Sequence, residues 1–154
     1  MLRLKYSLVI LSAIFALAGI GFIVHAMVTS QINLLHLLIL LIFVLLSSFC
    51  LNFHLKTLKL YHPTLKNYGP ITEGLLGSGT TIGHHLWISP IVFGLACIYL
   101  AISHASIFMK ALFNLGFTGN ALLSLCLFFV FMYFGVCTFI DLRKTNALIP
   151  LMTK

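Results

Sequence analysis

Charged residues, and acidic residues above all, are scarce in this sequence of 154 residues. Only 7% of the residues are charged, and Glu73 and Asp141 are the two acids. Soluble domains carry about 25% charged residues, so this composition excludes an ordinary water-soluble domain. Disordered chains combine low hydrophobicity with high charge, whereas 61% of this chain is hydrophobic, which excludes disorder as well. A single small membrane domain covering residues 1–154 is the class that is left.

Motifs of common catalytic and redox sites are also missing. No C-x-x-C pair occurs, which disfavours a thiol–disulfide relay. The glycine-rich run at residues 74–83 lacks the lysine of a phosphate-binding loop, which disfavours nucleotide binding. Both acids are expected outside the apolar segments, so no Ser–His–acid set can be built within a membrane. These absences favour a protein that is not an enzyme, without deciding the question.

Long apolar runs account for most of the chain. A transmembrane helix needs about 20 mostly apolar residues. Runs of suitable length without Lys, Arg, Asp or Glu lie at residues 6–27, 34–53, 86–103 and 121–140. The sequence therefore predicts an all-α integral membrane protein, a bundle of four transmembrane helices. A loop at residues 56–85 joins the second and third spans, and its first part, residues 56–62, is predicted to continue the second span as helix up to Pro63. Residues 105–120 are predicted to form a short helix at the outer membrane surface.

Basic residues are distributed unequally between the two sides of this predicted bundle. Of the nine Lys and Arg residues, all except Lys110 precede the first span, follow the second, or follow the fourth. Positive side chains concentrate on the cytoplasmic side of membranes. The chain is therefore expected in a bacterial inner membrane, with both termini and the loop at 56–85 on the cytoplasmic side. An organellar inner membrane is the alternative. Because the basic residues are spread over three segments, nucleic-acid binding is not expected.

Small residues predict which helices approach each other. Stripes of small residues let helix backbones pack closely in lipid, where no hydrophobic driving force acts between helices. Such stripes occur on the first span (Ser12, Ala16, Gly19) and on the third (Gly94, Cys97, Ala101). These two spans are therefore predicted to form the central pair. The second and fourth spans, rich in Leu and Phe, are expected to face lipid or a partner subunit, and Asp141 is expected to pair with Arg143 or Lys144.

Histidine is unusually frequent, with seven copies, none of them at the centre of a span. The predicted topology places three at the outer face, namely His25, His36 and His104. At the cytoplasmic face it places four, namely His54, His62, His84 and His85. Of these, His54, His84 and His85 are candidate ligands together with Glu73 in the loop before His84. Imidazole and carboxylate groups gathered at one face are able to bind Zn or Cu, and paired imidazoles are able to ligate haem b. Alternatively, these rings are interfacial side chains with one edge in water.

Three functions stay open at this stage. The first is a small multi-pass subunit of a larger inner-membrane complex, respiratory or secretory, with a structural role. Its partners are then the lipid bilayer and either other membrane proteins or further copies of the chain. The lack of a catalytic set and an apolar cytoplasmic loop that needs a cover favour this interpretation. The alternatives are a haem- or metal-linked redox protein that uses the histidines, and an oligomeric small-molecule channel or transporter.

Overall fold

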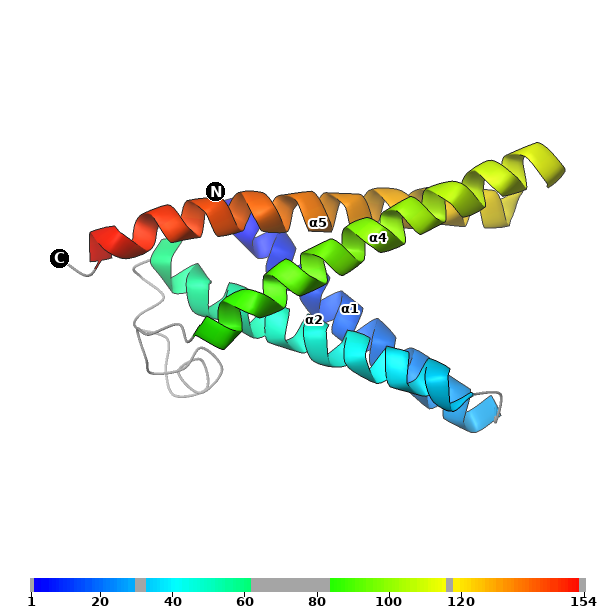
Figure 1. The fold of residues 1–154 in the computed structure, drawn as a ribbon, viewed down its shortest axis with the longest axis horizontal. Coiled ribbons are helices and arrows are strands. Elements are labelled where there is room, and N and C mark those ends of the chain that lie inside the picture. Colours follow the sequence, from blue (N-terminus) through cyan, green and yellow to red (C-terminus); the bar gives the residue numbers. More distant parts are fainter. Residues whose placement is uncertain (1, 30–32, 62–83, 116–117, 153–154) are drawn as a thin grey trace.

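The structure is a computed structural model of the chain as four long helices (Figure 1). It describes residues 2–29, 33–61, 84–115 and 118–152, and it describes side chains for all of these except 59–61, 84–87, 115 and 146–152. The helices are α1 (Leu2–Thr29), α2 (Leu34–Tyr61), α4 (His84–Leu115) and α5 (Gly119–Met152). Residues 62–83, most of the loop predicted at 56–85, lie outside the described residues.

The four helices are each long and apolar enough to cross a membrane, which confirms the predicted all-α architecture. They are longer than the predicted spans. The segments apolar enough to span a membrane extend over Leu2–Thr29, Leu34–Leu58, Ile88–Asn114 and Gly119–Thr145. Most of the predicted ends adjoin a polar residue, such as Lys5, His54 or Asp141. A helix satisfies its backbone groups internally whatever its side chains are, so it continues past such a residue.

Residues 105–115 form the C-terminal end of α4, so they are not a separate helix as predicted for this region. The physical reason is that no glycine or proline, the two residues that most disfavour helix, occurs between Gly94 and Gly116. The prediction that helix continues beyond the second span is confirmed as far as Tyr61.

Two hairpins make up the fold. Helix α1 packs along α2, and α4 packs along α5, while the contacts between the hairpins are made mainly by α2 and α4. The hairpins meet at the end of the bundle that holds the start of α1 and the end of α5, and they diverge toward the opposite end (Figure 1). We call the end where the hairpins meet the terminal end, and the end where they diverge the tip end.

The predicted central pair of first and third spans is wrong, because the described residues show no close backbone contact between α1 and α4. Small residues do permit close packing, but within each hairpin. A Cβ atom added to Gly19 of α1 would lie 2.5 Å from Cγ2 of Val44 in α2. A Cβ atom added to Gly135 of α5 would lie 2.6 Å from Cγ1 of Ile98 and 3.0 Å from the backbone oxygen of Gly94, both in α4. Helices that follow each other through a short connection pack as neighbours.

Aromatic rings from all four helices form the centre of the core. These are Phe15, Phe43, Phe93, Phe131 and Phe134. The ring of Phe15 is central, since its centroid lies between 5.2 and 6.2 Å from the centroids of the other four rings. Stacked and edge-to-face pairs of this kind add to the packing energy. The second and fourth spans thus contribute to the core as well as facing outward, contrary to the expectation for Leu- and Phe-rich helices.

Candidate functional site

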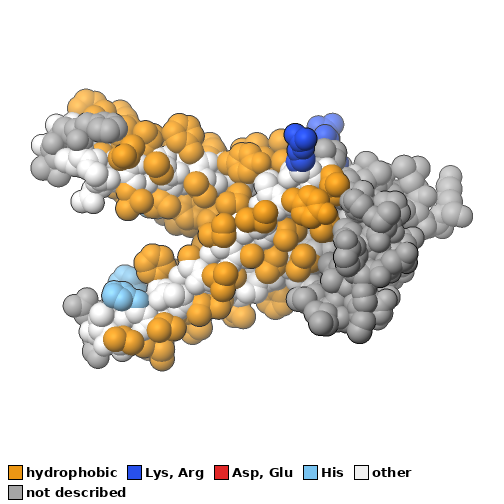
Figure 2. All heavy atoms as spheres, turned by 180° about the vertical axis from the view of Figure 1, so that it is seen from behind, with side chains coloured by type: hydrophobic (Ala, Val, Ile, Leu, Met, Phe, Trp, Pro, Cys, Tyr) orange, Lys and Arg blue, Asp and Glu red, His pale blue; other side chains and the backbone are white. Residues whose placement is uncertain are grey.

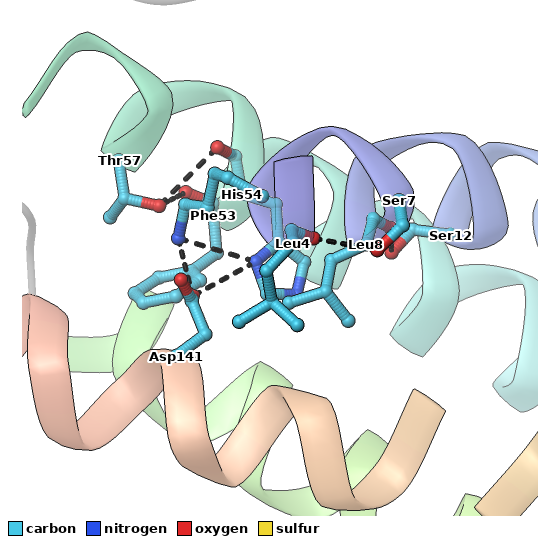
Figure 3. Close-up of polar contacts among 9 residues, drawn as sticks. Leu4, Ser7, Leu8, Ser12, Phe53, His54, Thr57 and Asp141 are labelled. Atoms are coloured by element: carbon cyan, nitrogen blue, oxygen red, sulfur yellow. Dashed lines mark hydrogen bonds and ion pairs between the residues drawn. The ribbon is translucent and has the colours of Figure 1, made fainter. Parts of the chain in front are cut away.

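A buried polar cluster at the terminal end of the bundle is the candidate site. It consists of Lys5 from α1, His54 from α2 and Asp141 from α5, and we call it the polar cluster (Figure 3). Each of the three residues is the first one beyond the end of a predicted span. Lys5 lies on the same face of α1 as the buried Leu8 and Ser12, at helical spacing, which directs its side chain inward.

The three side chains contact one another directly. Lys5 Nζ donates a hydrogen bond to Asp141 Oδ2 and forms an ion pair with it. His54 Nδ1 lies 3.5 Å from Lys5 Nζ and 3.4 Å from Asp141 Oδ2. The Lys5 ammonium also lies 5.2 Å from the centroid of the Phe53 ring, a cation–π contact. The expected pairing of Asp141 with Arg143 or Lys144 is therefore wrong, because the carboxylate points into the bundle, toward α1 and α2.

Burial makes this arrangement energetically demanding. The exposed fraction of the side chain is 0% for Lys5 and His54 and 1% for Asp141. Removing a charge from water costs several kcal/mol, and only a close partner of opposite charge offsets that cost. Lys5 and Asp141 carry opposite charges, so the cluster as a whole is neutral when the His54 ring is neutral. Such groups are rare in transmembrane helices and mark functional sites or structural locks.

His54 is held from several sides but keeps one nitrogen unpaired. Its ring meets Phe53 and Phe134 edge to face, with centroids 5.4 and 6.3 Å apart. Its Nε2 atom is buried without a hydrogen-bond partner, and so is Oγ1 of Thr138, which lies between Phe134 and Asp141 on α5. Buried polar atoms are almost always hydrogen-bonded, so these two atoms call for an explanation.

Further polar residues continue the buried surface along α2 and α5. On α2 a stripe at helical spacing is completely buried: Ser47, Cys50, His54 and Thr57. The Thr57 hydroxyl donates to the backbone oxygen of Phe53 at 2.8 Å, so it is satisfied within its own helix. On α5, Thr145 lies one turn beyond Asp141 and is also buried. The terminal half of the bundle therefore combines these buried polar residues with a small apolar cluster of Phe53 and Leu142, whereas the centre of the core is aromatic.

The three histidines predicted at the outer face do not gather in the structure. His25 and His36 are exposed near the tip end, on α1 and α2. His104 of α4 is half-buried, and its ring stacks on Phe131 with centroids 5.8 Å apart. Over the described ranges, no group of three or more His, Cys, Asp or Glu side chains lies close enough to hold a metal ion.

The metal or haem site predicted at the opposite face stays a prediction. Glu73 lies outside the described residues, and the side chains of His84 and His85 at the start of α4 are not described. His54 is the one member whose surroundings are known, and its Nδ1 atom is already engaged by Lys5 and Asp141.

Sequence reasoning missed the roles of Lys5 and Asp141. Lys5 was interpreted as a topology signal, and Asp141 as a surface acid paired with its neighbours in sequence. The sequence does contain one indication. Lys5, His54 and Asp141 each lie directly beyond the cytoplasmic end of a predicted span, so the predicted topology places them at the same depth. A lysine, a histidine and one of only two acids at one level are a set able to pair.

Comparisons with protein-family models, with curated proteins and with solved structures find no match to this chain. The class is thus defined by the structure alone. The chain is an all-helical protein whose four helices are able to span a membrane, with an ion pair and a histidine buried between its hairpins.

Proposed function

We propose that this chain is a small multi-pass subunit of a larger inner-membrane assembly, respiratory or secretory, and that its main contribution is a packing surface for a partner protein. The observation that carries the proposal is the separation of the two hairpins toward the tip end. Figure 2 shows the two arms apart at that end, both covered by apolar side chains.

The separation leaves large apolar side chains uncovered on both arms. Val28 of α1, Leu34 of α2 and Phe113 of α4 are 78%, 79% and 79% exposed. Most compact bundles bury the inner faces of their helices against each other along the whole length. Here the hairpins are joined at the terminal end and by the aromatic core, so an inserted transmembrane segment would complete the packing at the tip end.

Helix α1 also offers a surface suited to close helix packing. A Cβ atom added to Gly21 would meet nothing within 4 Å, and Ala18, one turn earlier, is exposed too. Between helices in lipid, association depends on close packing at small residues. An exposed pair of small residues near the tip end therefore suits a protein partner better than it suits lipid chains alone.

The proposed orientation follows from the basic residues. With the terminal end in the cytoplasm, all Lys and Arg residues except Lys110 lie on the cytoplasmic side of the spans or at their cytoplasmic ends. This is the distribution found in inner-membrane proteins. The tip end and its uncovered apolar faces then lie in the outer half of the bilayer.

Site-specific photo-cross-linking in native membranes tests the proposal. A photoreactive amino acid would replace Leu35 or Phe113, both exposed near the tip end, and Tyr6, exposed near the terminal end, would be the matched control position. We expect one discrete protein adduct from the tip positions and none from Tyr6. Native mass spectrometry in lipid nanodiscs would then give the stoichiometry.

Two results would decide the matter. An adduct of defined mass, either with another protein or with a second copy of the chain, supports an assembly role. Lipid adducts alone at the tip positions, together with a monomer of 17.1 kDa in nanodiscs, would overturn it.

A further inference from the structure

The unpaired nitrogen of His54 is the feature that the assembly role does not use. A purely structural lock needs only the Lys5–Asp141 ion pair, which is complete without the imidazole. Yet the ring is fully buried beside that pair, with Nε2 left without a partner. A group placed at this cost within a transmembrane bundle is a candidate for ion or proton handling.

We propose that the polar cluster is an intramembrane proton-binding site, in which Nε2 of His54 takes up a proton delivered from the terminal end. In the neutral ring, Nδ1 carries the hydrogen and donates it to Asp141 Oδ2, and Nε2 holds a lone pair. A hydronium ion transfers its proton to that lone pair and leaves as water. The ring becomes an imidazolium, and the charge of the cluster rises from zero to plus one.

The closed packing around the site selects a proton over larger ligands. The three side chains are 0–1% exposed, so no molecule reaches them without opening the bundle. A proton needs only a hydrogen-bonded path or a transient water molecule. The unpaired hydroxyl of Thr138, on the same face of α5 as Asp141 and Phe134, is a second polar atom able to hold such a water molecule.

Within the part of the chain that the structure describes, the aromatic core closes the side of the site that faces the tip end. Toward the tip end, Phe134 contacts the His54 ring and also packs against Phe15 and Phe93, so aromatic rings close the bundle there. Toward the terminal end, the buried hydroxyls of Thr57 and Thr145 lie one turn beyond His54 and Asp141. The site is therefore a store that fills from one side rather than part of a path across the membrane.

The neighbours of His54 define how proton binding is regulated. Lys5 on α1 opposes a positive ring and Asp141 on α5 favours it, while Cys50, one turn before His54 on α2, is a further ionisable group close to Lys5 and Asp141. The described side chains of α4 bring no ionisable contact to the ring. Once His54 is protonated, two cations share one carboxylate, so proton uptake weakens the hold of Lys5 on Asp141 and loosens the start of α1.

The test is a nitrogen-15 solid-state NMR titration of the full-length protein in liposomes, with labelled histidine. The His54→Gln variant assigns the His54 signals, and the exposed His36→Gln on the same helix is the matched control. We expect Nε2 to change from unprotonated to protonated as the pH falls. Lys5→Met should strengthen proton binding at His54 by about tenfold or more, and Asp141→Asn should weaken it similarly. Lys5→Arg, which keeps the charge, should titrate like the parent.

A His54 ring that keeps one protonation state at every pH at which the protein stays folded would overturn the proposal. This titration is measured on the parent protein, and the His54→Gln variant serves only to assign the signals. Equal titration midpoints in Lys5→Met and Asp141→Asn would overturn it as well. The proposal does not depend on the assembly role, because it is tested on the isolated protein.

Discussion

Lys5 and Asp141, 136 positions apart in the sequence, form an ion pair inside the bundle, and their side chains are 0% and 1% exposed. The pair joins the first helix of one hairpin to the second helix of the other. Those two helices share few other backbone contacts, since the hairpins meet mainly through α2 and α4. The Lys5–Asp141 pair therefore helps to fix the angle between the two hairpins.

Removing one member of this pair should strongly destabilise the protein. Lys5→Met leaves a buried carboxylate without its ammonium partner, and the expected loss in free energy of unfolding is about 3–5 kcal/mol. The double variant Lys5→Met with Asp141→Asn removes both charges and should recover most of that loss. Thermal unfolding in detergent micelles measures both effects. Arg143→Gln, at an exposed position on the same helix as Asp141, is the control and should change the stability little. Equal losses in Lys5→Met and Arg143→Gln would contradict the buried pair.

Close packing within the second hairpin should make Gly135 intolerant of a side chain. The added Cβ of Gly135→Ala would meet Ile98 at 2.6 Å and the backbone oxygen of Gly94 at 3.0 Å, and a backbone atom cannot move aside cheaply. We expect a loss of about 1–3 kcal/mol in free energy of unfolding. Gly21→Ala is the matched control, because its Cβ enters open space and alanine has the higher helix propensity. The melting temperature should fall for Gly135→Ala and hold or rise for Gly21→Ala. The reverse order would show that the α4–α5 contact is misplaced.

The aromatic core should depend on Phe15. Its ring contacts four other phenylalanine rings, so Phe15→Ala removes contacts between α1 and the three other helices. The expected loss in free energy of unfolding is about 3 kcal/mol, at the lower end for Phe→Ala changes in a core. In lipid the transfer of a ring into the core brings little hydrophobic gain, so the loss comes mainly from the missing packing contacts. Phe22→Ala, at a position that is 64% exposed on the same helix, should cost much less. Equilibrium unfolding with sodium dodecyl sulfate compares the two. A similar loss in both variants would argue against this core.

How far the sequence predicts this structure differs between the helices and their packing. Apolar run length is a local property, so the four helices can be predicted from the sequence. Their ends cannot, since α4 continues from the predicted end at residue 103 to Leu115. Partner choice depends on connections and on side chains far apart in the chain, so the stripes of small residues indicated close packing but not which helices it joins. Gly19 and Gly94 both pack closely, each against the other helix of its own hairpin.

The candidate site was only partly accessible from the sequence for a similar reason. His54 was singled out by composition, as one of seven histidines. Lys5 and Asp141 are ordinary residues for the ends of spans, and only the register of three helices brings them to His54. The partner of Asp141 lies on α1, 136 positions away, so it cannot be identified from the residues next to Asp141 in the sequence.

The membrane orientation gives a separate prediction. If the terminal end lies in the cytoplasm, alkaline phosphatase fused after Lys154 should be inactive, and a fusion inserted at Thr118, between α4 and α5, should be active. A green fluorescent protein fused at the two positions should give the opposite pattern. An active phosphatase after Lys154 would reverse the assignment of the two sides.

Pulsed electron spin resonance measures the divergence of the two hairpins directly. In a variant whose four cysteines are replaced by alanine, spin labels at Val28 and Phe113 would report the tip end, and labels at Tyr6 and Ile140 the terminal end; all four positions are exposed. The account predicts a clearly longer distance at the tip end, and a broadened terminal-end distance once Lys5 is replaced by methionine. Equal distances at both ends, unaffected by that replacement, would mean that the hairpins run side by side along their whole length, which would contradict the structure.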